Sequence, residues 1–502
     1  MSTLTSLARA IAADSGRAQP SCTVRHVHVS ERPLVFIPLA LAGEANAPLA
    51  ALVGDDPATP TLLIVPEPRD RDQRFAFAAD LAAVVLRYIR TYLAAEEPVG
   101  ARKTKEEEDT RYADAPQLLV PNPAGIAFTR LLGRSTRFRR AEGEYAVAES
   151  VPVLGRWLTF FAERAEHPAS SLMLAVTEAL AMHWATGQSP VEDLNLGALL
   201  GWIDPPPGLS GAQAAALAED PVRCPPAGPA TDPTFDNEIL EARIIAVRTG
   251  RLTGGGRAYD RAKTALTDAL ATQLEPTWTL MWRAVALLGR LPAGAHVQTR
   301  WDTDKAAFTW HARHLRDGGP PQPRRDGAVA AARRLANAER IQDMVAAQRA
   351  FDDPLVMAEH RMTGEAFAGR VAAAEPDRLD ATGRRRVLRP RITVETADLD
   401  FAAQDAELTS PARPAQKARV IAITAAGPRN AIVLELKGGM GRALTPEPGT
   451  VPAVGECVSY AAFSDGYQPP PAFPDPEDTP WTHGGPPPPY VPADEDARED
   501  WS

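Results

Sequence analysis

The chain has 502 residues, 44% of them hydrophobic and 24% charged, and this length predicts several domains rather than one hydrophobic core. The formal net charge is −10, but residues 464–502 carry eleven prolines and nine acidic residues against one arginine, so the remainder is nearly neutral. No stretch approaches the roughly 18 apolar residues of a membrane span, and three scattered cysteines, Cys22, Cys224 and Cys457, argue against a disulfide framework or a zinc ribbon.

The composition also indicates a bacterial, cytoplasmic protein. Arginine, alanine and proline are frequent while lysine is scarce, a bias typical of high-GC bacteria. The first residues, MSTLTSLARAIAADSGRAQ, lack the continuous apolar core of a signal peptide. We therefore expect a cytoplasmic protein without a membrane partner.

Residues 1–116 are expected to form a mixed α/β domain. Four segments before residue 68, TVRHVHV, PLVFIPLAL, LAALVGD and TLLIVPEP, have the pattern of short strands. The next segment, RDQRFAFAADLAAVVLRYIRTYL, places apolar residues at helical spacing. A charge run over residues 100–116 then predicts a solvated loop at the domain boundary.

Residues 117–325 are expected to form a helical domain, and residues 326–383 a helical hairpin. Helical patterns in the first of these begin at Val151, Ser170, Val191, Phe235, Ala258, Pro276 and Lys305. The clusters DPPPGL and RCPPAGPATDPT predict loops, because proline and glycine break both helix and strand. In the hairpin, a break is expected near Asp352, Asp353 and Pro354.

Residues 384–463 return to strand patterns, with ITVET, ARVIAIT, AIVLELK and CVSYAAF separated by turns rich in glycine or asparagine. They predict a small antiparallel β-barrel of OB-like or SH3-like type. Residues 464–502 are expected to be a disordered, acidic, proline-rich tail, because prolines that lack an N–H favour extended backbone without a core of its own. The fold class predicted for the whole chain is α+β, multidomain.

Sequence motifs argue against several chemistries. No G-x-x-x-x-G-K-[ST] phosphate loop and no G-x-S-x-G nucleophile elbow occurs. The histidine pairs His26 with His28 and His311 with His314 lack nearby cysteine or histidine partners, so core or exposed histidines are favoured over metal ligands. We therefore expect no metal and no cofactor in the leading interpretation.

One enzymatic alternative remains open. Asp55 and Asp56 end one predicted strand and Glu67 ends the next, and an acid followed by a strand with Glu-x-Lys would resemble the PD-(D/E)xK nucleases, whose carboxylates hold Mg²⁺. Here Arg69 replaces the lysine and Pro68 intervenes, which favours turn acids. The alternative is thus a Mg²⁺-dependent nuclease with these three residues as catalytic ligands.

Nucleic-acid binding has broader support at the start of the predicted barrel. Small barrels bind single strands through a basic groove and stacking aromatic rings. The candidate contacts are Arg384, Arg385, Arg386, Arg389, Arg391, Lys437, Arg442 and Tyr460.

The leading hypothesis is a non-catalytic adaptor or accessory subunit of a bacterial nucleic-acid-processing or defence assembly. The barrel would contact DNA or RNA, and the C-terminal tail would dock a protein partner such as an ATPase, helicase or nuclease. A structural protein-interaction scaffold is the third hypothesis, and it predicts no salt-sensitive nucleic-acid binding.

Overall fold

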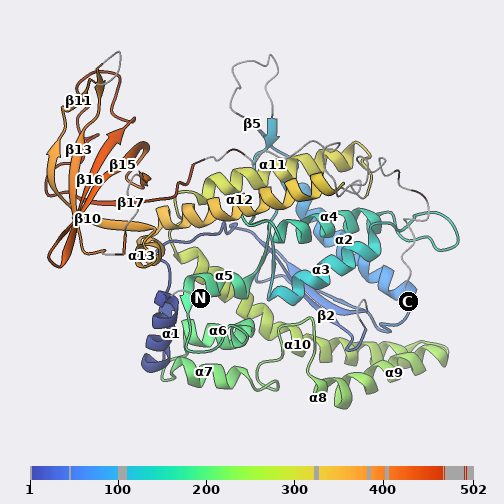
Figure 1. Cartoon of the computed structure of the whole chain (residues 1–502). Helices are drawn as coiled ribbons and strands as arrows, with labels where there is room; N and C mark the ends of the chain where they lie inside the picture. The colour runs from blue at the N-terminus through green and yellow to red at the C-terminus, as the bar shows by residue number, and fades with distance from the viewer. Residues whose placement is uncertain are drawn as a thin grey trace.

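The computed structural model describes residues 3–44, 47–99, 110–321, 327–381, 386–398, 400–401 and 406–466, together with residues 469, 491 and 493. The protein is a mixed α+β structure, as the sequence predicts, with an α/β body, a helical arm and a closed six-stranded antiparallel barrel (Figure 1). Most of the tail expected at residues 464–502 lies outside the described residues.

A five-stranded mixed sheet forms the centre of the body. Its strands are β2 (Leu34–Ala40), β3 (Pro48–Gly54), β4 (Thr61–Ile64), β7 (Leu118–Val120) and β8 (Met173–Ala175). The spatial order is β4-β3-β2-β7-β8, in which β3 runs antiparallel to both neighbours while β7 and β8 run parallel to β2. Strands from both sides of residue 116 therefore belong to one sheet.

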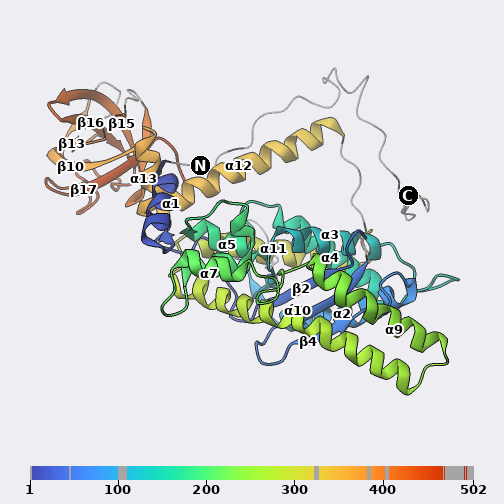
Figure 2. The ribbon, with the colours of Figure 1, turned by 90° about the horizontal axis from the view of Figure 1, so that it is seen from below.

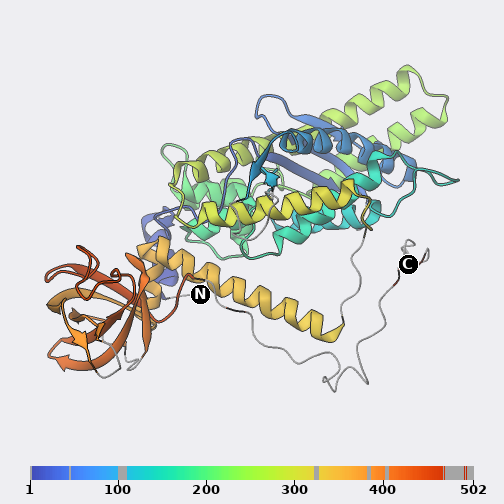
Figure 3. The same cartoon turned by 90° about the horizontal axis from the view of Figure 1, so that it is seen from above.

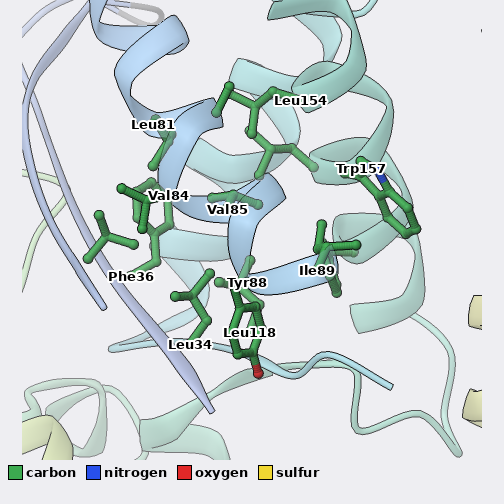
Figure 4. Packing of buried hydrophobic residues seen from close by; sticks show 14 of the residues in the cluster. Leu34, Phe36, Leu81, Val84, Val85, Tyr88, Ile89, Leu118, Leu154 and Trp157 are labelled. Atoms are coloured by element: carbon green, nitrogen blue, oxygen red, sulfur yellow. The ribbon is translucent and has the colours of Figure 1, made fainter. Parts of the chain in front are cut away.

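Helices cover both faces of this sheet. One face carries α2 (Arg71–Tyr92), α3 (Pro123–Thr136), α4 (Ser150–Ala165) and α11 (Val297–Arg316). The other carries α5 (Val176–His183), α6 (Leu196–Ile203), α9 (Glu241–Leu252) and α10 (Arg257–Arg290). Alternate residues of β2 enter the two cores, which explains why its sequence is apolar throughout. Figure 4 shows β2 and β7 residues packing against α2 and α4.

Shorter elements complete the body. They are α1 (Thr3–Ser15), β1 (Gln19–Pro20), β5 (Glu96–Pro98), β6 (Thr110–Tyr112), β9 (Trp184–Ala185), η1 (Glu192–Leu194), α7 (Gly211–Ala218), α8 (Pro233–Phe235) and η2 (Asp236–Leu240). Among the described residues, no helix is both long and apolar enough to cross a membrane.

The domain boundary expected at residue 116 is wrong, because the segments before and after it share one core. Leu118 is 1% exposed and packs in the same cluster as Phe36 and Leu81. The helical pattern after residue 117 comes from helices that flank the sheet. In this region the sheet contributes only β7 and β8. Each is three residues long, which is too short for a distinct period-two pattern.

The sequence predicts two helices that begin at Ala258 and at Pro276, but the structure has one helix, α10, that continues through the proline. A proline inside a helix costs roughly 3 kcal/mol. Here Leu270, Leu274, Trp278 and Met281 lie buried on both sides of the proline and pack against the sheet. This packing outweighs the lost hydrogen bond, so tertiary burial decides the outcome.

The TVRHVHV segment does not form the expected strand, apart from a single bridge between Arg25 and Ala293. Its backbone bonds to side chains instead of to a neighbouring strand. The N–H of His26 donates to His183 Nε2 (2.9 Å), and that of His28 donates to Ser171 Oγ (3.0 Å). The alternation in the sequence is not matched by burial, because the adjacent residues His26 and Val27 are both buried while the rest of the segment is half-buried or exposed.

The arm consists of α12 (Ala328–Asp352) and α13 (Pro354–Met362), so the chain breaks where Pro354 begins the second helix. The barrel order is β10-β13-β16-β15-β14-β17. Its strands are β10 (Ala366–Glu375), β13 (Arg391–Thr396), β14 (Glu407–Ser410), β15 (Arg413–Ala426), β16 (Arg429–Lys437) and β17 (Cys457–Ala461), with β11 (Leu379–Asp380) and β12 (Val387–Leu388) as a separate ribbon. The barrel thus begins at residue 366 and not at residue 384. Figures 2 and 3 show α12 extending alongside the body from the barrel end.

One joint fixes the barrel end to the body. Asp352 Oδ1 lies 2.6 Å from His296 Nδ1, and its Oδ2 accepts the backbone N–H of His296 (3.1 Å). His296 Nε2 lies 3.1 Å from Oδ2 of Asp465, a residue that follows the last barrel strand. Asp353 Oδ2 accepts the N–H groups of Thr23 and Val24. The chain entering the barrel and the chain leaving it therefore meet the body at the same place.

Replacing Leu118 with alanine should lower the unfolding free energy of the body by about 2–5 kcal/mol, because the change leaves a cavity between β7 and α2. Chemical denaturation followed by circular dichroism measures it. Leu335→Ala is the control, since Leu335 is 62% exposed and its loss should cost no more than about 0.5 kcal/mol. Two body transitions, only one of them shifted, would contradict the single shared core.

The joint should weaken as pH rises. The hydrogen bond to Asp352 raises the pKa of His296 above its ordinary 6.5, although partial burial opposes this. A raised folded-state pKa stabilises the protonated form, so the contribution is complete below about pH 6.5 and is lost as pH passes the higher value. Wild type should therefore exceed His296→Gln in unfolding free energy by more at pH 6 than at pH 9. A difference that grows with pH would rule out this role for the imidazolium.

Candidate functional site

An arginine-lined cleft of about 480 Å³ opens beside the N-terminus of α2 and the C-terminus of α3. Arg71, Arg74 and Arg139 line it, together with Phe75 and one carboxylate, Glu44. Asp70 caps α2 by accepting the N–H groups of its first turn, which orients the arginines that follow. The cleft is therefore rich in cationic donors.

Aromatic rings hold these guanidinium groups in place. The Arg71 guanidinium lies 4.7 Å from the Phe75 ring centroid and 5.6 Å from that of Tyr145. Arg139 lies 5.2 Å from the same Phe75 ring. Arginine can stack one face on a ring while it donates hydrogen bonds in the plane of its guanidinium group, the arrangement in which it recognises phosphate or carboxylate. Arg71 already donates to Asp72 and to the Tyr145 carbonyl.

A second, smaller cleft of about 150 Å³ lies between α4 and the C-terminal half of α11. Arg137 and Arg156 line it with Trp310, His314 and the carboxylate Glu163. Burial raises the pKa of Glu163, although Arg137 opposes that shift. The shift reflects the cost of removing the charged carboxylate from water at this position.

Trp310 is the most exposed tryptophan for which the structure gives an accessibility, at 67%. Its ring stacks on His314 with centroids 5.2 Å apart and planes 8° apart. The neighbouring His311 is instead held between Phe160 and Trp157, and burial lowers its pKa to about 3. His311 thus forms part of the core, whereas Trp310 offers a large aromatic face to solvent.

The loop after α3 links the two clefts. Thr136 and Arg139 line the first, and Arg137 lines the second. Both clefts lie among the helices of the same sheet face, α2, α3, α4 and α11. Together they form what we call the basic face. Its arginines and aromatic residues are Arg71, Arg74, Arg137, Arg139, Arg156, Phe75 and Trp310. Such a surface can bind an anionic ligand that also carries flat rings.

The usual ligand position of an open α/β sheet is covered in this protein. Ligands commonly bind at the carboxyl ends of the strands where the strand order changes direction, which here lies between β2 and β7. Ala40 donates its N–H to the Pro229 carbonyl (2.8 Å), and Asn122 Nδ2 donates to the Gly228 carbonyl (2.8 Å). A Cβ at Gly228 would collide with the Pro38 carbonyl. The loop containing Gly228 therefore occupies that position.

The three predicted nuclease carboxylates do not come together. In the register of β3 and β4, Val53 pairs with Thr61 and Ala50 with Ile64. Asp55 and Asp56 therefore lie at one end of this hairpin and Glu67 lies at the other, about 20 Å away by the rise of the strand. Metal ligands must instead approach one ion within 2.0–2.6 Å.

Each of these acids has a structural partner. Asp55 pairs with Arg32, and Asp56 accepts the N–H of Ala58 in the turn. Glu67 is 8% exposed and pairs with Arg251, while Gln73 also donates to it. The sequence interpretation as turn acids agrees with these contacts.

Three of the predicted nucleic-acid contacts on the barrel are buried or already paired within the protein. Tyr460 is 1% exposed and packs beside Phe367 inside the barrel, so its ring is not available for stacking on a base. Arg391 shares the Glu435 carboxylate with Arg378, which offsets part of its charge. Arg389 is half-buried and donates to the Leu388 carbonyl.

The other predicted barrel contacts differ in how exposed they are. Arg386 and Arg442 are exposed, and Lys437 is half-buried at the end of β16. Arg384 and Arg385 lie outside the described residues. Arg391 pairs in register with Glu435, two residues before Lys437, so these two predicted contacts lie at the same end of the barrel.

The basic face was missed in the sequence, although a signal was present. Residues 129–140, TRLLGRSTRFRR, contain five arginines and no acid. The helical period of their apolar residues draws attention to packing, and the partners on α2 and α11 are distant in sequence. Charge density along one short segment could have identified this part of the face.

Comparison of the chain with protein-family models, with curated proteins and with solved structures finds no match.

Removing the candidate nuclease carboxylates should leave Mg²⁺ binding unchanged, because Asp55 and Glu67 lie at opposite ends of a hairpin. Isothermal titration with MgCl₂ should give the same heats for wild type and for the Asp55→Asn, Glu67→Gln double variant. Glu67→Gln should also reduce stability, since it weakens the pair with Arg251. A saturable Mg²⁺ heat that only the double variant loses would restore the metal-site hypothesis.

Proposed function

We propose that this protein is a non-catalytic, nucleic-acid-binding accessory subunit that contacts a single strand through its basic face. The observation that carries the proposal is the pairing of arginine-lined clefts with the exposed Trp310 ring. Arginines would contact phosphates, and Trp310 would stack on a base. Both DNA and RNA fit this chemistry.

Physical chemistry favours a nucleic acid over a small anion on this surface. A small anion needs a compact, enclosed pocket, whereas these clefts are open and joined by the loop after α3. Base stacking on an aromatic ring is worth roughly 1–3 kcal/mol per base, and each phosphate contact adds a salt-dependent term. A polymer is the ligand that can use both clefts at once.

Binding is favoured over catalysis because of what lines the clefts. Among the described lining residues, each cleft has one carboxylate, Glu44 or Glu163, and neither has a cysteine. A carboxylate pair or an activated nucleophile is the usual requirement for hydrolysis. The nuclease alternative is therefore the weaker proposal.

The adaptor role depends on the C-terminal tail, which lies mostly outside the described residues. An acidic, proline-rich peptide suits docking to a protein partner or competition with nucleic acid for arginines. A scaffold that binds only proteins is the second proposal. Comparing the full chain with one ending at residue 466 separates the roles, because stronger nucleic-acid binding after truncation indicates competition and lost complex formation indicates docking.

Fluorescence anisotropy with a labelled single-stranded oligonucleotide tests the basic face. Trp310→Ala should weaken binding about tenfold, the equivalent of losing one stacked base. The Arg71→Ala, Arg139→Ala double variant should lower the slope of log affinity against log salt by about 1.4, which is 0.7 for each phosphate contact to a single strand.

Arg290→Ala is the matched control, because Arg290 is an exposed arginine at the end of α10, a helix that packs on the opposite face of the sheet. Its affinity and salt slope should equal those of wild type. Loss of binding in Arg389→Ala, Lys437→Ala with the basic-face variants unaffected would move the contact to the barrel. Salt-insensitive or absent binding by both the full and the truncated chain would favour the protein scaffold.

A further inference from the structure

A buried cysteine, histidine and aspartate meet where the arm joins the body. Cys22 and His26 come from the segment after β1, and Asp353 lies between α12 and α13. The three residues are 3%, 4% and 1% exposed, and one ligand atom from each lies within 4.8 Å of the other two. This is the one such mixed cluster within the described residues.

The His26 ring is the unexplained member of the cluster. Neither of its nitrogens has a hydrogen-bond partner among the described residues, and Nε2 stops 3.6 Å from Asp353 Oδ2. Leaving a buried polar atom unpaired costs roughly 1–3 kcal/mol. Burial, together with the charge of Arg349, lowers the pKa of His26 to about 4. A neutral imidazole has one nitrogen with a lone pair that can bind a metal ion.

A second histidine holds this ring in position. His183 Nδ1 lies 2.6 Å from the Ala179 carbonyl and must therefore carry its hydrogen, which leaves Nε2 to accept the N–H of His26. The two rings stack with centroids 5.8 Å apart. Because its nitrogens are already used, His183 orients His26 and is not a further ligand.

We propose that Cys22, His26 and Asp353 bind a divalent transition-metal ion, for which Zn²⁺ best matches the ligand set. Thiolate, imidazole and carboxylate are the usual Zn²⁺ ligands, at about 2.3, 2.0 and 2.0 Å. Ligand atoms around a tetrahedral ion are then roughly 3.3–3.6 Å apart. The 3.6 Å separation of His26 Nε2 from Asp353 Oδ2 falls at the upper end of this range, and all three ligand atoms lie within 4.8 Å of one another.

The surrounding charges define how the metal would compete with a proton. Burial raises the pKa of the Cys22 thiol, while Arg349 lowers it through its charge and a hydrogen bond. Without a metal, the charge of Arg349 offsets that of Asp353 beside the thiol. Because a cysteine binds a metal ion as the thiolate, metal binding must displace the thiol proton. Arg300, which donates to the His26 carbonyl, adds positive charge nearby.

Such an ion would join two chain segments, residues 22–26 of the body and residue 353 of the arm. Asp353 Oδ2 already accepts two N–H groups from the first segment, and Oδ1 accepts the N–H of Leu355 at the start of α13. The metal would add to these contacts and hold the barrel end against the body. This role is independent of nucleic-acid binding at the basic face.

Equilibrium dialysis of chelator-treated full-length protein against Zn²⁺, with elemental analysis, tests the site. Wild type should bind one Zn²⁺ per chain, and Cys22→Ser and His26→Ala should each bind less than a tenth of that. Cys224→Ser, Cys457→Ser is the matched control and should keep one equivalent. Circular dichroism establishes that each variant is folded.

Co²⁺ titration of wild type gives a readout that needs no variant. A near-ultraviolet thiolate-to-cobalt band is expected, together with the visible absorption of a tetrahedral ion. Failure of wild type to bind stoichiometric Zn²⁺, absence of the thiolate band, or full Zn²⁺ binding by folded Cys22→Ser would overturn the proposal.

Discussion

Two adjacent carboxylates, Asp352 and Asp353, determine where the arm and barrel lie relative to the body. The first bonds to His296 on the body, and the second caps α13 while accepting backbone N–H groups of residues 23 and 24. Since Asp465 also reaches His296, the chain that enters the barrel and the chain that leaves it are held at one joint. Because both aspartates are removed from water, loss of any of these partners would leave a buried charge unpaired and lower the stability of the joint.

The doubly covered sheet restricts where function can reside. Both faces of β2 are packed, and the loop at Gly228 covers the carboxyl ends of β2 and β7. Polar groups that can meet a ligand therefore lie at helix ends and on outer helix surfaces. The basic face is of this kind, since its arginines and Trp310 lie at the start of α2, in the loop after α3 and on the outer surfaces of α4 and α11.

Local patterns in the sequence predicted many elements, but not how they associate. The strand and helix patterns between residues 34 and 92 and the strands of the barrel were legible from local sequence. β2 is apolar on both faces, whereas α2 and β16 each carry apolar residues at the spacing of one buried face. The sequence did not show that residues on both sides of residue 116 share one sheet and core, because β7 and β8 are three residues long and their partners are distant in sequence. The continuous α10 was missed for a related reason, as the burial around Pro276 depends on the sheet.

The sequence by itself determined the mixed α+β class, the break before Pro354 and the absence of nucleotide-loop and nucleophile-elbow motifs, since each depends on neighbouring residues. Only the tertiary structure separated Asp55 from Glu67, buried Tyr460, and brought Arg71, Arg137 and Trp310 onto one face. It also joined Cys22 and His26 to Asp353, more than three hundred residues away. Long-range packing decides such meetings, and short-range periodicity carries no information about them.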